Sequence, residues 1–272
     1  MWFEGCGAGI LLVKIALLQF EPEFGELEKN VEIVRNSCAG LRADLVVLPE
    51  LCTSGYQFRD RTEVEKFAQA VDGPALTALE KIAAGCGGHI VAGFAESAGS
   101  KIFNSAALVG PGGTVGLYRK IHLFSDECRL FDPGDKGFPV FEIGQAKVGM
   151  MICFDWLFPE SARSLTMAGA QIIAHPANLV LPYCQDAMVT RAVENHVFTA
   201  TCNRTGREER LAGRPMVFTG SSRLVAPDGK VLAEGSPDGQ ELIAVEIDPS
   251  VADDKQITPQ NDILRDRRPD QY

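Results

Sequence analysis

The chain has 272 residues, of which 46% are hydrophobic and 23% are charged, and its formal net charge at pH 7 is −10. A chain of this length buries about three-quarters of its unfolded surface, so a large hydrophobic core is available. The acidic residues are spread along the chain, which disfavours nucleic acid and anionic membranes as partners and favours a small-molecule substrate. No apolar stretch approaches the roughly 20 residues that are needed to cross a bilayer.

The cysteines and histidines give no metal pattern. None of the eight cysteines forms a C-x-x-C pair, and the four histidines lie far apart in the sequence, so we expect neither a metal nor a cofactor. Residues 1–9 lack the basic region and cleavage site of a signal peptide and are predicted to be an N-terminal extension. No low-complexity linker follows, so residues 10–272 are predicted to be one domain of a cytoplasmic protein with reduced thiols.

Strand and helix patterns alternate through the first half of the chain. Short apolar runs predict strands at 13–20, 45–48 and 89–94, and apolar residues at helical spacing predict helices at 27–40 and 74–84. Strand-like runs at 104–109 and 114–119 flank the turn residues Gly110-Pro111-Gly112-Gly113, which indicates a hairpin.

The second half continues the alternation. The apolar run 146–154 predicts one strand, followed by a helix at 159–170, a strand at 172–174, a helix at 186–197 and a strand at 198–202. A second hairpin is predicted at 224–233 around Pro227-Asp228-Gly229. The pattern as a whole predicts an α/β protein, with antiparallel strands added to a parallel centre and helices on the outer faces.

Three of the predicted strands end at reactive side chains. Glu50 follows the strand at 45–48, Lys120 follows the strand at 114–119, and Cys153 lies at the end of the strand at 146–154. Functional residues of α/β sheets gather beyond strand ends, and loop NH groups there are expected to lower the pKa of the thiol. A carboxylate base, a cation and a thiol are sufficient for acyl transfer. Taken singly, each residue also fits a structural role: a core cysteine, a solvated lysine and a loop cap.

Four segments carry a resemblance to a known family. Phe20, Leu48-Pro49-Glu50, the segment 118–124 (YRKIHLF) and the segment 152–160 (ICFDWLFPE) resemble the signature blocks of the nitrilase superfamily, in the same order. The resemblance extends from about Val13 to the region of Ile263.

This resemblance implies a four-layer α-β-β-α sandwich and a catalytic triad of Glu50, Lys120 and Cys153. Members of the family often carry a second glutamate near the site, and Glu127 occupies that position. The preceding residues are Ser125-Asp126 where a glycine is frequent. The alternative for Glu127 is a structural ion pair with Arg119 or Arg129.

Three further residues are candidates for the substrate pocket. The backbone NH of Phe154 is expected to meet the developing oxyanion, and Tyr56 lies on the loop after Glu50, which shapes the acyl pocket in similar proteins. His175 follows a predicted strand and is a candidate pocket residue, with a buried structural histidine as the alternative.

The expected function is hydrolysis of a small amide or nitrile through a cysteine thioester, giving a carboxylic acid and ammonia. The same triad serves an N-carbamoyl amidohydrolase or a true nitrilase, which remain alternatives, whereas a non-catalytic scaffold is disfavoured because all three triad residues are present. The family resemblance also implies a homodimer or higher oligomer, and the irregular segment Asp248–Tyr272 is expected to extend over a partner subunit.

Overall fold

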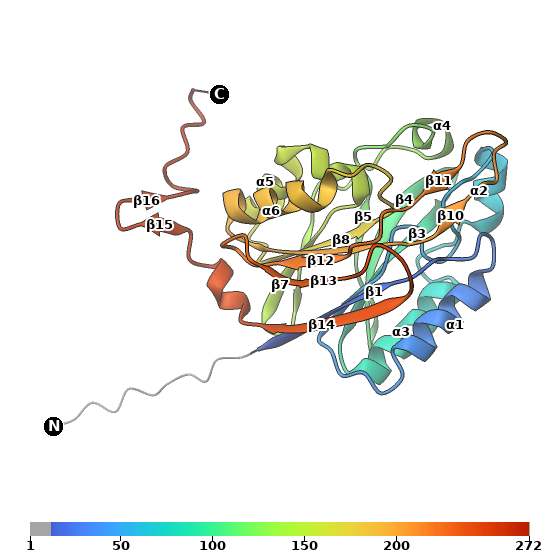
Figure 1. Ribbon diagram of the computed structural model, residues 1–272, viewed down its shortest axis with the longest axis horizontal. Coiled ribbons are helices and arrows are strands. Elements are labelled where there is room, and N and C mark those ends of the chain that lie inside the picture. The colour runs from blue at the N-terminus through green and yellow to red at the C-terminus, as the bar shows by residue number, and fades with distance from the viewer. Residues whose placement is uncertain (1–11, 272) are drawn as a thin grey trace.

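Residues 12–271 are described by a computed structural model, and the predicted N-terminal extension at 1–9 lies outside them. Two six-stranded sheets pack face to face, and helices cover the outer face of each sheet (Figure 1). The predicted four-layer α-β-β-α sandwich is confirmed.

The first sheet has three parallel strands at its centre and antiparallel strands on both sides. β1, β2 and β3 run parallel, β14 pairs with β1, and β4 and β5 follow β3 as antiparallel neighbours. In spatial order the strands are β14 (Glu241–Ile247), β1 (Val13–Gln19), β2 (Leu45–Val47), β3 (His89–Ala98), β4 (Lys101–Gly110) and β5 (Gly113–Arg119).

The second sheet repeats this plan. β7, β8 and β9 are parallel, and antiparallel strands flank them on both sides. In spatial order the strands are β13 (Val231–Glu234), β12 (Arg223–Val225), β9 (Phe198–Asn203), β8 (Ile172–Ala177), β7 (Ala146–Met150) and β6 (Val140–Ile143).

Helices and small strand pairs complete the described part of the chain. α1 and α3 cover the first sheet, and α5 and α6 cover the second (Figure 1). The helices are α1 (Leu27–Ser37), α2 (Arg61–Phe67), α3 (Pro74–Cys86), α4 (Glu127–Leu130), α5 (Pro159–Met167) and α6 (Cys184–Asn195), with 3-10 turns η1 (Cys153–Leu157) and η2 (Pro249–Ala252). The small strands are β10 (Arg207–Glu208), β11 (Met216–Val217), β15 (Gln256–Thr258) and β16 (Asn261–Asp262).

The core follows from the two-residue period of a strand. In β1, Ile15 and Leu17 pack into the core between the sheets, whereas Ala16 and Leu18 pack against the helices of the first sheet. Both faces of the central strands are therefore buried, which explains why these strands appear in the sequence as continuous apolar runs.

One structural prediction is extended and another needs correction. The predicted parallel centre with added antiparallel strands occurs twice, once in each sheet, and β14 from late in the chain completes the first sheet. The predicted strand at 146–154 is wrong beyond Met150, since the chain leaves the sheet there and enters η1 at Cys153. Both predicted hairpins are confirmed, as β4–β5 and β12–β13.

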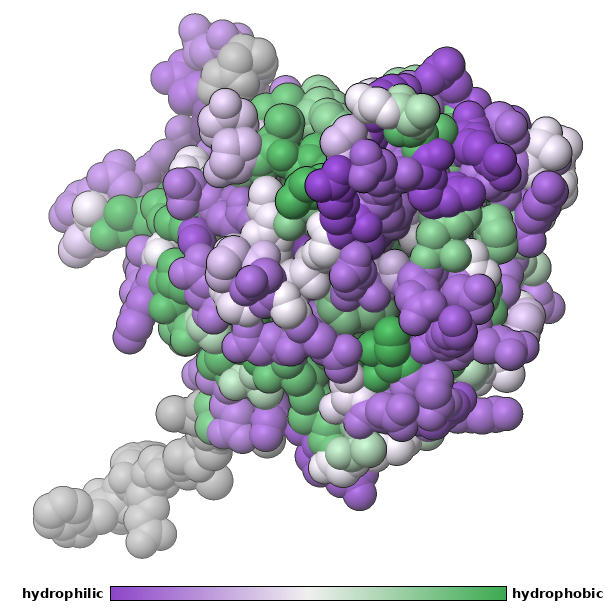
Figure 2. All heavy atoms as spheres, turned by 45° about the vertical axis from the view of Figure 1, so that its right-hand side comes forward, coloured by the Kyte–Doolittle hydropathy of each residue, from purple (hydrophilic) through white to green (hydrophobic). Residues whose placement is uncertain are grey.

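One face of the protein is mostly polar. Figure 2 shows hydrophilic side chains over most of one face, interrupted by smaller hydrophobic groups. Among the described residues, none of the helices has the length and apolar character that a membrane crossing requires. The C-terminal segment after β14 leaves the sandwich and forms the β15–β16 hairpin at its edge (Figure 1).

Candidate active site

Glu50 is held beyond the end of β2 by a tight approach to β3. A Cβ atom added to Gly93 of β3 would lie 2.5 Å from the Cα atom of Glu50, so only glycine permits this packing. Pro49 accepts a backbone hydrogen bond from Gly93, and Leu51 turns the chain with a φ of 47°. The side chain of Glu50 is 0% exposed.

Lys120 follows β5 directly and lies between two carboxylates. Its Nζ atom donates to Oε1 of Glu50 at 2.7 Å and to Oε1 of Glu127 at 2.8 Å, and its side chain is 0% exposed. A buried ammonium needs this compensation, because burial without a partner would strip its charge. The three predicted residues Glu50, Lys120 and Glu127 are thus in direct contact.

Glu127 begins the short helix α4 and is bound on several sides. Besides its bond with Lys120, it accepts hydrogen bonds from the Tyr56 hydroxyl at 2.6 Å and from the backbone NH of Phe124 at 3.0 Å. Ser125 makes a left-handed turn before it, with a φ of 51°. This conformation is strained for a residue with a Cβ atom, and a glycine would adopt it without that strain.

The alternative partners for Glu127 are both engaged elsewhere. Arg119 pairs with Glu96 and Asp135, and Arg129 pairs with Asp126. The structural ion pair with Arg119 or Arg129 is therefore wrong, since neither guanidinium contacts Glu127 in the described residues 12–271.

Cys153 lies on a sharp turn at the start of η1. Its φ is 39°, a strained conformation for a side chain with a Cβ atom, whereas Ile152 before it is still extended. Burial, followed by the charge of Glu50, raises the pKa of the Cys153 thiol well above its ordinary value. The expected lowering is wrong, because Lys120 and the backbone NH of Asn178 act in that direction but do not outweigh burial.

The charges of the cluster oppose the effect of burial. Burial raises the pKa of Glu50, and the neighbouring ammonium of Lys120 only partly offsets it. For Lys120, burial lowers the pKa, but the charges of Glu127 and Glu50 outweigh burial and raise it. The lysine therefore stays protonated, while Glu50 is easier to protonate than a solvated glutamate.

Asp155 joins the segment of Lys120 to the segment of Cys153. Its Oδ2 atom accepts the Tyr118 hydroxyl at 2.6 Å and the NH of Ile152 at 2.8 Å, and its Oδ1 atom lies 2.7 Å from Nδ1 of His122. Tyr118 and His122 flank Lys120 on both sides, so one buried carboxylate fixes the spacing of the thiol and the ammonium. Sequence reasoning assigned no role to Asp155.

His175 lies behind the thiol turn. It is part of β8 rather than the residue after a strand, and it is 0% exposed. Its Nε2 atom lies 2.9 Å from the carbonyl oxygen of Cys153 and its Nδ1 atom lies 3.0 Å from Oγ1 of Thr201. Burial lowers the pKa of His175 to about 4, so the ring is neutral and supports the turn from behind.

Asn104 is a further member of the cluster that the sequence analysis did not identify. Its Nδ2 atom donates to Oε1 of Glu50 at 2.7 Å. A signal was present in the sequence, because Asn104 and Ser105 are adjacent polar residues inside the otherwise mostly apolar run of β4.

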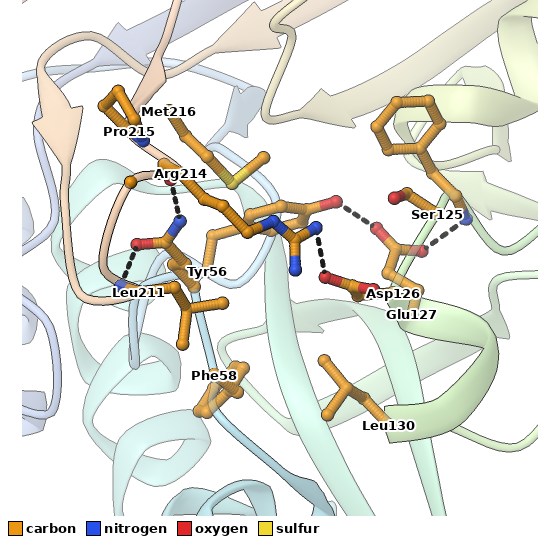
Figure 3. Close-up of a pocket in the computed structure, with 13 residues that line it drawn as sticks. Tyr56, Phe58, Ser125, Asp126, Glu127, Leu130, Leu211, Arg214, Pro215 and Met216 are labelled. Atoms are coloured by element: carbon orange, nitrogen blue, oxygen red, sulfur yellow. Dashed lines mark hydrogen bonds and ion pairs between the residues drawn. The ribbon is translucent and has the colours of Figure 1, made fainter.

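A cavity of about 380 Å³ opens beside Tyr56 and Glu127. In Figure 3 the side chain of Arg214 crosses it toward Asp126, to which it forms an ion pair at 2.7 Å. Gln57 fixes another part of the wall. Its side chain donates a hydrogen bond to the carbonyl of Arg214 and accepts one from the backbone NH of Leu211. The cavity is therefore bordered by the glutamate that contacts Lys120.

A second and much narrower cavity, of about 10 Å³, lies at Cys153 and is lined by Phe154, Asn178 and Phe124 among others. Phe124 lines both cavities, and its ring lies 5.0 Å from that of Phe154. Tyr56 and Phe154 thus line cavities at the cluster, whereas His175 lines neither of the two.

No group of three or more histidine, cysteine or acidic side chains within residues 12–271 is arranged to hold a metal ion.

A buried thiol beside a lysine and two carboxylates, on an α-β-β-α sandwich, has the parts of a thiol-dependent hydrolase. The chain belongs to the carbon-nitrogen hydrolase family, whose model matches residues 14–256. The protein is a hydrolase of carbon–nitrogen bonds.

Relatives and solved structures cover nearly the whole chain. A nitrilase of Pyrococcus abyssi is 46% identical, over 96% of this chain and 99% of the relative. An (R)-stereoselective amidase of Pseudomonas sp. is 32% identical, over 94% and 92%. A mutant amidase of Nesterenkonia sp. AN1, which shows Michael addition of acrylamide at its active-site cysteine, is 26% identical with a TM-score of 0.77, over 95% and 98%.

Proposed function

We propose that Cys153, Glu50 and Lys120 hydrolyse a small amide through a thioester on Cys153, with Glu127 orienting Lys120. The observation that carries this proposal is the fully buried ammonium of Lys120 between two carboxylates, whose charges all act on the thiol. Such a cluster is costly in a purely structural role, since hydrophobic residues would stabilise the same space as well or better.

The reaction begins with proton transfer. Because the thiol pKa is raised, Cys153 is protonated at neutral pH, and it needs Glu50 to accept its proton as the sulfur attacks the amide carbon. The ammonium of Lys120 and the backbone NH of Phe154 meet the oxyanion that forms. Glu50 returns the proton to the departing amine, and water activated by Glu50 then cleaves the thioester to the acid.

The nature of the scissile group is a separate question. A nitrile would add the thiol to form a thioimidate, and addition of water with loss of ammonia would then give the same thioester, so a nitrilase reaction is the second candidate. The names of the relatives favour keeping both, because they include a nitrilase and an amidase. An N-carbamoyl substrate is the third candidate, favoured by relatives named N-carbamoylputrescine amidase.

Trapping of the intermediate tests the proposal. After mixing with excess amide and acid quenching, intact-mass and peptide analysis should find the acyl group on Cys153, and Cys153→Ala should abolish both the adduct and ammonia release. Cys128 is exposed and serves as the matched control, since Cys128→Ser should leave turnover unchanged. Turnover that survives in Cys153→Ala would contradict the proposal. Ammonia release from a short amide, a dinitrile and an N-carbamoyl amine, compared at equal concentration, separates the three substrate classes.

We also propose a cytoplasmic homodimer or larger assembly in which 10–272 form one domain. The cysteines of the described residues are free thiols, as a reducing compartment favours. The β15–β16 hairpin supports a role in subunit contact, because Ile257 on it is 55% exposed. Light scattering at micromolar concentration should give at least a dimeric mass, and truncation after η2 should lower that mass if the hairpin holds the partner.

A further inference from the structure

Asn178 is a rigidly placed residue beside the thiol. It follows β8 and is 2% exposed, and its backbone NH acts to lower the pKa of the Cys153 thiol. The next residue is fixed from two directions, since the NH of Leu179 donates to Oδ1 of Asn203 at 2.9 Å and its carbonyl accepts from Thr219 at 3.0 Å. The position of Asn178 is therefore fixed by the bonds of its neighbour, and its own side chain is not needed for them.

The side-chain amide of Asn178 has no partner in the described residues. Both Nδ2 and Oδ1 are buried without a hydrogen bond. Buried amides are nearly always bonded, because an unsatisfied donor and acceptor each cost the protein stability. Within residues 12–271, Oε2 of Glu50 is also unpartnered, so two residues near the thiol keep free hydrogen-bonding capacity.

The surroundings of this amide are small and uncharged. The narrow cavity at Cys153 holds about 10 Å³, and among the described residues that line it Asn178 alone has a side-chain amide. Apart from Asn178 and Cys153, the cavity is lined by apolar or aromatic residues, which are Phe124, Phe154, Trp156, Leu179, Val180 and Leu181. Leu181 is 37% exposed, so this wall reaches the protein surface.

We propose that the Asn178 amide binds an uncharged hydrogen-bonding group on a short acyl chain of the substrate. This inference rests on the proposed function, because it places the acyl carbon at Cys153. An apolar pocket with one polar group selects ligands by that group. No charged side chain lines this cavity, and the nearby Lys120 ammonium is already paired with Glu50 and Glu127. Asp126 and Arg214 lie at the wider cavity, which Phe124 also lines.

Three amides of matched length test this specificity. β-Hydroxypropanamide carries a hydroxyl where butanamide carries a methyl group, and malonamate carries a carboxylate. The wild type should show kcat/KM at least about tenfold higher for β-hydroxypropanamide than for the other two, because a site that binds a hydroxyl rejects analogues without it. In Asn178→Leu, which keeps the volume and removes the amide, the preference over butanamide should disappear.

Asn195→Leu is the matched control. Asn195 on α6 is also 0% exposed with an unpartnered Oδ1 atom, but it lines neither of the two cavities. This variant should change thermal stability and leave the substrate ratio as in the wild type. If Asn178→Leu fails to fold, Asn178→Ala removes both atoms of the amide without adding bulk, and its ratio should also fall.

The outcomes separate the two proposals. If Cys153 carries no acyl group with any amide, the proposed function fails. If Cys153 is acylated but the wild type treats the three amides alike or prefers malonamate, the inference about Asn178 is overturned. An equal loss toward butanamide and β-hydroxypropanamide in Asn178→Leu would likewise overturn it, since Asn178 would then only support the fold or the thiol.

Discussion

The two sides of the Cys153 thiol differ in how completely their polar groups are bonded. On the side of Lys120, Glu127 accepts bonds from the ammonium, the Tyr56 hydroxyl and the NH of Phe124. On the side that Asn178 lines, the side-chain amide has no partner in the described chain, and Oε2 of Glu50 is the other polar atom near the thiol that is left unpartnered there. The bonded side is arranged before substrate arrives, as electrostatic catalysis requires, whereas the open side is available to a ligand.

Hydrogen-bonded and unpartnered groups should also differ in what they contribute: the first to catalysis and the second to substrate recognition. Groups that are already hydrogen-bonded need little reorganisation in the transition state. Substitution of such a group should therefore lower kcat for every substrate. Groups without partners gain a bond only when a matching substrate binds, so changes there should alter the choice among substrates. The following variants are chosen to break this distinction.

Removal of the ammonium should have the largest effect. In Lys120→Met, the oxyanion loses its cation and two buried carboxylates face each other, so we expect kcat/KM to fall at least about a thousandfold for all amides. Loss of one partner from a buried ion pair costs about 3–5 kcal/mol, and the melting temperature should fall as well. Lys147→Met is the control, because Lys147 is exposed on β7. Wild-type kcat in Lys120→Met would remove Lys120 from the mechanism.

Glu127→Gln should have the next largest effect. Glutamine keeps the shape and can still accept bonds, but it removes the charge that fixes the ammonium, which should lower kcat by about a hundredfold at similar stability. Rate and melting temperature are measured on one preparation. Glu160→Gln, at an exposed position on α5, should change neither. A lower melting temperature with unchanged turnover per folded molecule would assign Glu127 to the fold alone.

The sequence predicted the bonded side better than the open side. Glu50, Lys120 and Cys153 were identifiable because each lies at the end of a predicted strand and within a segment that resembles a family signature. The turn at Cys153 was not, because an apolar sequence continues past Met150 although the chain leaves the sheet there. Unsatisfied atoms depend on the absence of partners in three dimensions, so no pattern in the sequence could mark Asn178.

Long-range contacts account for most of what else was missed. Asn104 meets Glu50 from 54 residues away, and Asp155 meets Tyr118 from 37 residues away. Only the polar pair in β4 gave a local sign of such a contact. The fold was more predictable, because its strands and helices follow from local periodicity, but the division into two sheets required pairing information that periodicity lacks.

Acid should stop the reaction before it unfolds the protein. The pKa of Glu50 is raised, mainly by burial, so the base is lost at a pH above the ordinary glutamate value. The pKa of Glu63 is lowered to about 2, chiefly through its hydrogen bond with Arg210. A carboxylate with a lowered pKa contributes stability that is complete above its unfolded pKa and is lost as pH falls toward the folded value.

Activity and stability should therefore separate on the pH axis. Below the pKa of Glu50, kcat/KM should fall about tenfold per pH unit while the melting temperature changes little until the pH drops below the ordinary glutamate value. Both are measured in one buffer series. In Glu63→Gln, the melting temperature should fall less steeply at low pH, and the pH at which kcat/KM falls should be the same as in the wild type. An activity limb that coincides with unfolding would contradict the assignment of Glu50 as the base.

The smallest effect is expected at the outer edge of the bonded side, in Tyr56→Phe. This variant removes the hydroxyl bond to Glu127 and keeps the ring, which packs edge-on against Phe218 with centroids 6.1 Å apart. One hydrogen bond to a charged group contributes about 1.5 kcal/mol, so kcat should fall about tenfold, equally for every amide. Tyr183→Phe, at a side chain 64% exposed, is the control and should be silent.

A second variant tests whether the hydroxyl acts from a position that the backbone sets. The carboxylate of Glu208 accepts the backbone NH groups of Tyr56 and Gln57 and pairs with the buried guanidinium of Arg204. Glu208→Gln should lower stability, since Arg204 loses its countercharge, and it should lower kcat because Tyr56 shifts away from Glu127. If Glu208 acts through the hydroxyl, the double variant should have the kcat of Tyr56→Phe alone. Effects on kcat that multiply instead would show that Glu208 reaches the site by another route, and a loss confined to one amide would move Tyr56 from the bonded side to substrate recognition.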